Sequence, residues 1–236
     1  MNILITGTST GIGAALAQHY LQLGHQVFGI SRKKNITLAE YGAYSHQKLD
    51  LTRFSRVRKR VSSFLSPVEK LDLVILNAGI LNEIKDLKDT SIEEIEEVMD
   101  INVWANKNLI DALYKLKKPV TQVAAISSGA AVSGSRGWNA YSISKAALNM
   151  IVSLYSKEHT NTHFIALAPG LIDTNMQEYI CNLPDSDKYP AVRILKEARG
   201  TDKMPTPIEA APLIANAIEQ SKAYESGSFV DIRKME

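Results

Sequence analysis

The segment Tyr141-Ser142-Ile143-Ser144-Lys145 holds a phenol and an ammonium group four residues apart. On a helix, this spacing places Tyr141 and Lys145 on the same face. A nearby ammonium stabilises a phenolate and lowers the pKa of a tyrosine from about 10 toward neutrality. Such a tyrosine can donate a proton to a developing alkoxide and accept it back in the reverse reaction. The pair therefore predicts acid–base chemistry, provided that other functional groups surround it.

Two serines, Ser127 and Ser128, follow an apolar run that we expect to form a strand. A neutral hydroxyl at the end of a strand can polarise a carbonyl oxygen by hydrogen bonding to it. Either serine could fill this role. A tyrosine, a lysine and a hydroxyl together favour the interconversion of a carbonyl and an alcohol.

A glycine-rich segment, Thr6-Gly7-Thr8-Ser9-Thr10-Gly11-Ile12-Gly13, lies between a predicted strand and a predicted helix. Glycines allow the backbone to approach a pyrophosphate closely, and the N-terminus of the following helix supplies oriented N–H groups and a positive dipole end. A glycine-rich turn without a ligand is the alternative interpretation. Because the segment has the strand-loop-helix context that dinucleotide binding requires, we predict a dinucleotide cofactor.

The predicted second strand ends in Ser31-Arg32-Lys33-Lys34. Folds that bind NAD place an acidic residue here, on the 2′-hydroxyl of the ribose. A guanidinium instead forms a charge-assisted fork with a 2′-phosphate, which a carboxylate would repel. A solvated basic turn is the alternative, but together with the glycine-rich segment Arg32 favours NADP(H).

Short apolar runs alternate with longer helical patterns, which predicts a parallel sheet covered by helices on both faces. We expect an α/β fold: a single-domain, Rossmann-type, doubly wound parallel sheet of about seven strands over residues 1–236. Residues 173–207 interrupt the alternation with four prolines and mixed charges, and we interpret them as a lid over the substrate. The predicted strands are 2–6, 26–31, 45–49, 71–76, 121–127, 162–168 and 228–232; the predicted helices are 12–23, 52–65, two within 91–116, 139–158 and 208–221.

The net charge of +2 argues against a nucleic-acid or membrane partner. A basic cluster within residues 53–60 lacks interleaved aromatic residues and is interpreted as a solvated helix face, as is an acidic cluster at 93–97. Cys181 is alone, so no disulfide within the chain is possible, and the five histidines lack ligand spacing, so no metal is predicted. Without a signal-peptide pattern or an apolar run of membrane length, we expect a cytoplasmic protein.

The spacing of the glycines, with three residues between Gly7 and Gly11, resembles that of the short-chain dehydrogenase/reductase family. The resemblance spans nearly the whole chain and implies a catalytic set of Asn102, Ser128, Tyr141 and Lys145. It favours Ser128 over Ser127, and it gives Asn102 the role of supporting a water near the lysine. The implied cofactor-binding residues are Gly7, Ser9, Thr10, Gly11, Ile12, Gly13, Ser31, Arg32, Asp50, Leu51, Asn77, Ala78, Gly79, Tyr141, Lys145, Pro169, Gly170, Ile172 and Thr174.

Three further positions resemble members of the sepiapterin reductase and benzil reductase type, which reduce α-dicarbonyl compounds with NADPH. Trp138 and Met176 are expected to line the substrate pocket beside Ser128 and Tyr141, and Asp231 falls where a carboxylate anchors a pterin. Asp231 could equally be an edge charge paired with Arg233. In the same way, Asp50 could meet the adenine, cap the following helix, or do both.

The resemblance therefore implies an NADP(H)-dependent reductase acting on a small carbonyl compound. A non-catalytic NADP(H)-binding sensor, an alcohol dehydrogenase, and a β-ketoacyl reductase with Arg136 and Arg193 near its docking site remain as alternatives. Family members commonly pair through two helices, so a homodimer or homotetramer is expected. The residues suited to such pairing are Ile143, Ala146, Ala147, Met150 and Ile151.

Overall fold

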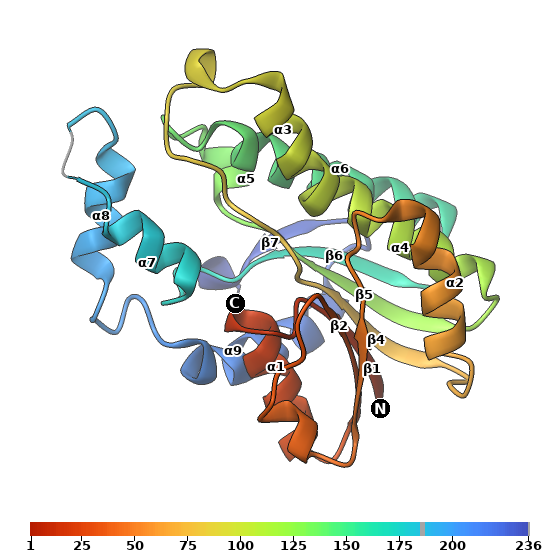
Figure 1. Cartoon of the computed structure of the whole chain (residues 1–236). Helices are drawn as coiled ribbons and strands as arrows, with labels where there is room; N and C mark the ends of the chain where they lie inside the picture. The colour runs from red at the N-terminus through yellow and green to blue at the C-terminus, as the bar shows by residue number, and fades with distance from the viewer. Residues whose placement is uncertain (185–186, 236) are drawn as a thin grey trace.

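A single parallel sheet of seven strands runs through the molecule in the order β3-β2-β1-β4-β5-β6-β7 (Figure 1). The computed structural model describes residues 1–184 and 187–235. Every neighbouring pair of strands is parallel, so their carboxyl ends lie at one edge of the sheet. The strands are β1 (Asn2–Thr6), β2 (Gln26–Ser31), β3 (Tyr44–Lys48), β4 (Leu71–Leu76), β5 (Val120–Ile126), β6 (His163–Ala168) and β7 (Phe229–Asp231).

Helices cover both faces of this sheet, as the alternating pattern predicts. Helices α1 and α9 contact each other on one face, and α2, α4 and α6 cover the other. The helices of eight or more residues are α1 (Gly11–Gln22), α2 (Phe54–Phe64), α3 (Ile92–Met99), α4 (Ala105–Lys115), α6 (Asn139–Glu158), α8 (Pro190–Ala198) and α9 (Pro207–Gln220). The doubly wound fold and the strand count are confirmed, with strand bounds within one residue of those predicted.

Two hydrophobic cores lie on opposite faces of the sheet because successive strand residues point in opposite directions. Leu4 and Val74 enter the core beneath α2, α4 and α6, whereas Ile3, Ile5 and Ile75 enter the core beneath α1 and α9. All five are fully buried, and burial of each such side chain contributes about 1.5–3 kcal/mol. These cores hold the strand ends, and the loops that follow them, in fixed positions.

The segment 173–207 contains two helices, α7 (Asn175–Cys181) and α8, where the sequence analysis expects only a lid of unspecified structure. Pro190 does not oppose this, because it occupies the start of α8, where its missing N–H is not needed. The lid has a small core of its own that includes Ile180, Val192 and Leu195 and reaches Trp138. Asp185, within the lid, lies outside the described residues. A short helix, α5 (Ala130–Ser133), follows β5.

The predicted pair of helices over 91–116 is joined without a loop. Residues Asp100–Trp104 form a π-helical turn that links α3 directly to α4. Such turns displace one residue from the regular hydrogen-bond ladder and occur frequently at functional sites. Here the π-helical turn contains Asn102.

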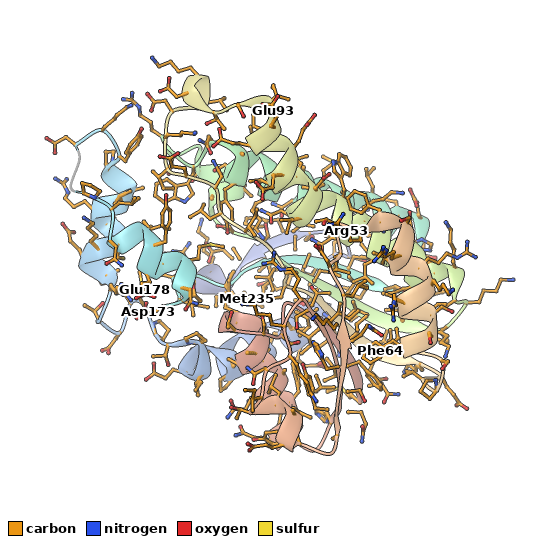
Figure 2. All side chains as sticks on the ribbon, viewed as in Figure 1. Arg53, Phe64, Glu93, Asp173, Glu178 and Met235 are labelled. Carbon is orange, nitrogen blue, oxygen red and sulfur yellow. The ribbon has the colours of Figure 1, made fainter. Side chains whose placement is uncertain are left out.

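The two charged clusters lie at the surface, in keeping with the solvated faces that the sequence predicts. Arg53 precedes α2 and Glu93 lies on α3, both exposed (Figure 2). The other basic residues of the first cluster, Arg56, Arg58, Lys59 and Arg60, are exposed as well. Within the described residues, no helix is long and apolar enough to cross a membrane.

Candidate active site

A cavity of about 870 Å³ opens at the carboxyl ends of the strands, where the chain order reverses between β1 and β4. Ligands of open α/β sheets bind at this switch point. The structure brings nearly all of the predicted residues to the wall of this one cavity. They are Gly7, Ser9, Thr10, Gly11, Ile12, Ser31, Arg32, Asp50, Leu51, Asn77, Ala78, Gly79, Ser128, Trp138, Tyr141, Lys145, Pro169, Gly170, Ile172, Thr174, Met176 and Asp231.

The loop after β1 is fastened to the loop after β4. The Thr6 hydroxyl accepts hydrogen bonds from the backbone N–H groups of Asn77 (2.9 Å) and Ala78 (3.0 Å). In return, the Asn77 side-chain amide donates to the Thr6 carbonyl at 3.0 Å. These contacts fix the floor of the cavity beside Gly7, whose φ of +76° is one that side chains disfavour.

Gly13 does not line the cavity; it permits the close packing beneath it. A Cβ at this position would lie 2.4 Å from Nδ2 of Asn77 and 2.5 Å from the Gly7 carbonyl oxygen. The first turn of α1 therefore lies against the glycine-rich loop, and Thr10 at its N-cap makes no side-chain cap hydrogen bond. The first backbone N–H groups of α1 thus face the cavity, as an anion site requires.

We expect Gly13→Ala to lower the free energy of unfolding by about 1–3 kcal/mol, because overpacking forces the loop and Asn77 apart. Urea denaturation followed by circular dichroism measures this. Gly42→Ala is the matched control, since a Cβ on Gly42 would meet nothing within 4 Å. Equal stability of the two variants would contradict the packing role of Gly13.

A hydrogen-bonded group lies beneath the far end of the cavity, where β2 ends. The Ser31 hydroxyl donates to the Lys33 carbonyl at 2.7 Å and lies 2.9 Å from Nε2 of His46. The Tyr44 hydroxyl lies 2.9 Å from that of Thr8. The Ser31 hydroxyl therefore donates its only proton within the turn that carries Arg32. No sequence pattern predicts Tyr44 and His46 as partners in this group. The Arg32 side chain itself is exposed on the cavity wall.

Asp50 also lines the cavity, but it does not cap α2. Its Oδ1 accepts hydrogen bonds from the backbone N–H (3.1 Å) and hydroxyl (2.8 Å) of Thr52, closing a turn, whereas the residue at the N-cap is Arg53. The alternative of a helix cap is therefore wrong. The Thr52 hydrogen bonds, with Arg32 and Arg53 nearby, outweigh burial and hold the pKa of Asp50 below its usual value.

Tyr141, Ser128 and Lys145 meet at the centre of the cavity. Lys145 is 5% exposed, and its Nζ donates to the Ile126 carbonyl at 2.8 Å and lies 5.6 Å from the centroid of the Tyr141 ring. Burial raises the pKa of Tyr141, and a hydrogen bond with Ser128 offsets part of that rise. Burial also lowers the pKa of Lys145 to about 8. Ser127 hydrogen-bonds Asn149 instead, at 2.6 Å.

The prediction that Lys145 lowers the pKa of Tyr141 does not describe this state of the site. The helical spacing does bring the two side chains together, but burial raises the pKa of the phenol, and the hydrogen bond with Ser128 offsets only part of that rise. A phenol with a raised pKa remains protonated at neutral pH. A protonated phenol in this position can donate a proton to a bound ligand.

Asn102 is fully buried behind the cavity wall instead of on it. Its Oδ1 accepts from the Ile80 N–H at 2.8 Å, and its Nδ2 donates to the Ile80 carbonyl and to the Ser144 hydroxyl, both at 2.9 Å. A Cβ on Gly79 would lie 3.1 Å from Asn102 Oδ1 and 3.6 Å from Lys145 Nζ. Asn102 thus fixes the strand-end loop next to Lys145, and its side chain is committed to this task.

The opposite end of the cavity is lined by the lid and the C-terminal residues. Trp138 and Met176 line it, as predicted. The carboxylate of Asp231 is paired with Arg233 through two hydrogen bonds of 2.9 and 2.6 Å, so the structure shows the pairing that the sequence analysis left open. Arg233 and Lys234 line the cavity too. The motifs do not mark Arg233 or Lys234 as site residues, although two basic residues directly after the last predicted strand are a signal that reveals them.

An ion pair joins the predicted lid, residues 173–207, to the rest of the molecule. Asp86 receives two hydrogen bonds from Arg136, at 2.8 and 2.7 Å, and Lys188 of the lid lies 3.2 Å from the same carboxylate. At the base of the lid, the Asp173 N–H donates to the Pro205 carbonyl at 2.9 Å; Asp173 is labelled in Figure 2. The hydrogen bonds from Arg136 hold the pKa of Asp86 well below its usual range, so this cluster keeps its charge at neutral pH.

We expect Asp86→Asn to raise hydrogen exchange in α8 by up to about fivefold, because exposed ion pairs make small contributions to local stability. Hydrogen–deuterium exchange followed by mass spectrometry at neutral pH measures the exchange rate of the α8 amides. Glu225→Gln removes an exposed ion pair with Lys157 outside this segment, and it should leave that exchange unchanged. An equal rise in both variants would show that Asp86 does not fasten the lid.

Comparison with known proteins bears on this geometry. The family model for short chain dehydrogenases matches residues 1–182. A benzil reductase ((S)-benzoin forming) of Saccharomyces cerevisiae is 33% identical over 75% of this chain and 74% of its own. A benzil reductase of Bacillus subtilis is 29% identical over 98% of both chains. An NADPH-dependent pterin aldehyde reductase of Arabidopsis thaliana is 30% identical over 74% of this chain and 76% of its own.

The fold has a close counterpart among solved structures. A short chain dehydrogenase/reductase from Saccharomyces cerevisiae superposes with a TM-score of 0.86 at 24% identity, covering 99% of this chain and 96% of that chain. The family model thus covers β1 to α7, which includes the glycine-rich loop, Ser128, Tyr141 and Lys145. The chain is an oxidoreductase acting on CH–OH or C=O groups, and it belongs to the short-chain dehydrogenase/reductase family.

Proposed function

We propose that this protein is an NADP(H)-dependent carbonyl reductase that reduces a small ketone or α-dicarbonyl compound, with Tyr141 as the general acid. The observation that carries the proposal is the meeting of Ser128, Tyr141 and Lys145 with the phosphate-binding loop in one cavity. The curated relatives named as benzil and pterin aldehyde reductases support this substrate class.

The residues at one end of the cavity fit the cofactor. Gly13 lets the first turn of α1 pack against the glycine-rich loop, and the uncapped N-terminus of α1, where Gly11 and Ile12 line the cavity, would bind a pyrophosphate. Arg32 lines the cavity, where it would bind a 2′-phosphate, and Pro169, Gly170, Ile172 and Thr174 line it where they would hold the nicotinamide half. When bound, the reduced nicotinamide supplies a hydride to the carbonyl carbon.

The chain's own residues complete the reduction. The hydroxyls of Ser128 and Tyr141 bind the carbonyl oxygen, and Tyr141 gives its proton to that oxygen as the carbon becomes a carbinol. Lys145 stabilises the phenolate that remains and binds the nicotinamide ribose. Asn102 holds the loop beside Lys145. The phenolate regains its proton from solvent through Lys145.

The same geometry bears on one other member of the reaction class. A β-ketoacyl reductase needs basic residues free to dock an acidic carrier, but Arg136 is paired with Asp86 and Arg193 with Glu197. These pairs favour a small, free carbonyl compound as the substrate.

We also propose that the protein is a homodimer or homotetramer. Helix α6 exposes Ile143, Met150 and Leu154, which are 42%, 60% and 55% exposed. A row of large apolar side chains on one long helix is suited to pairing with a second copy. Light scattering on the purified protein distinguishes the two assemblies from a monomer.

The test is the rate of NADPH and, separately, NADH oxidation with benzil, diacetyl, sepiapterin, an acetoacetyl thioester and simple aldehydes. Turnover of the dicarbonyls with NADPH strongly preferred is the expected result. Tight NADPH binding with no turnover of any compound would overturn the proposal in favour of a non-catalytic sensor. A preference for the thioester would favour the β-ketoacyl reductase.

A further inference from the structure

Arg233 places a cationic group at the substrate end of the cavity. A Cβ on Gly129, the residue after Ser128, would lie 3.5 Å from Nη2 of Arg233, and one on Gly170 would lie 3.4 Å from its Cδ. The arginine therefore lies across the two loops that flank the reacting centre. Both loops also belong to the cavity wall.

The pairing of Arg233 with Asp231 leaves part of the guanidinium unused. A guanidinium carries five N–H donors in a fixed plane, and Asp231 takes one from Nε and one from Nη2. The Asp231 side chain is 10% exposed, whereas that of Arg233 is 55% exposed. Asp231 is thus committed to holding the arginine, while the outer edge of the guanidinium remains open to a ligand.

The charge at this end of the cavity is positive. Among the described residues on its wall, the charged side chains here are Lys145, Arg233 and Lys234 against Asp231. A cationic or amidine-like group would have to displace Arg233 before it could reach Asp231. A carboxylate, in contrast, matches the planar fork of an arginine.

We propose that Arg233 binds a carboxylate of the substrate, and that the enzyme takes 2-oxo acids, in which this carboxylate adjoins the reacting carbonyl. This inference rests on the proposed carbonyl reduction and narrows its substrate class. Asp231 acts as the residue that positions Arg233, not as an anchor for the substrate.

The experiment compares phenylglyoxylate with its methyl ester, which has the same reacting carbonyl and no charge. The readout is the ratio of kcat/KM for the acid to that for the ester. Arg233→Leu should lower this ratio at least about tenfold, because a charge-assisted pair is lost. Asp231→Asn keeps the Oδ1 acceptor that positions Arg233 and removes only the charge that neutralises it, so it should raise the ratio about threefold. Lys157→Gln, which removes an equal charge from an exposed pair with Glu225, should leave it unchanged.

Changes in the same direction for Arg233→Leu and Asp231→Asn, or no change in the ratio, would overturn the proposal, because a merely structural pair would act in that way. A raised KM for NADPH at a constant ratio would also overturn it, by assigning the arginine to the cofactor. Failure of the wild type to reduce the ester or benzil would instead refute the proposed function. In that case, calorimetry with benzoate still tests whether Arg233 binds a carboxylate.

Discussion

Tyr141→Phe is expected to lower kcat for benzil reduction by about 10²–10⁴-fold, the usual contribution of a positioned general acid. The substitution removes only the hydroxyl that Ser128 contacts and leaves the ring in its place beside Lys145. The binding of NADPH should change by less than about threefold, since the glycine loop and Arg32 hold most of the cofactor. Single-turnover kinetics and fluorescence titration with NADPH measure the two quantities separately.

A matched tyrosine distinguishes this effect from a general loss of stability. Tyr179→Phe removes the same hydroxyl from an exposed position on α7, where it does not line the cavity. It should retain full turnover. Retained turnover in Tyr141→Phe would contradict the assignment of the acid, and Ser128 would then be the remaining hydroxyl on the wall.

The spacing of Tyr141 and Lys145 predicts that the two side chains lie together, but it does not predict the direction in which the pKa of Tyr141 shifts. Four residues on a helix place Tyr141 and Lys145 together, and the structure confirms that juxtaposition. The direction of the pKa shift depends instead on how much water reaches the phenol, which only the assembled lid and strand ends decide. The Lys145 ammonium is also drawn to the Ile126 carbonyl, a contact across 19 residues of chain.

The predictable part of the site consists of loops that directly follow strands. Gly7, Asn77 and Ser128 each follow an apolar run, and parallel strands bring their carboxyl ends to one edge. Their convergence thus follows from the element order alone. Asp231 is expected in the site from the family resemblance, and in the structure it ends β7 at the same edge.

The unpredicted part depends on contacts between distant segments. The lid helices α7 and α8 pack against Trp138 through a small core of their own, and no local pattern reveals that partner. The pairing of Arg233 with Asp231 depends on a short helical turn after β7, which the sequence alone leaves undetermined. Likewise, Gly13 matches the cofactor motif yet acts by allowing close packing.

Arg32→Glu is expected to lower kcat/KM for NADPH by about 100-fold or more, since it replaces a charge-assisted contact with repulsion of the 2′-phosphate. The activity with NADH should hold or rise, because a carboxylate at the end of β2 can accept a hydrogen bond from a ribose 2′-hydroxyl. Steady-state rates with both cofactors, at one fixed ionic strength, give the ratio that decides this.

Lys33→Glu provides the control, because it makes the same change of charge at the next residue, which does not line the cavity. A contact role for Arg32 requires that the ratio of NADPH to NADH activity fall much further in Arg32→Glu than in Lys33→Glu. Equal falls that vanish at high salt would show that the basic turn attracts NADPH through its overall field. Ser31, whose proton is already donated to the Lys33 carbonyl, could not supply the missing contact, so specificity for the phosphate depends on the guanidinium.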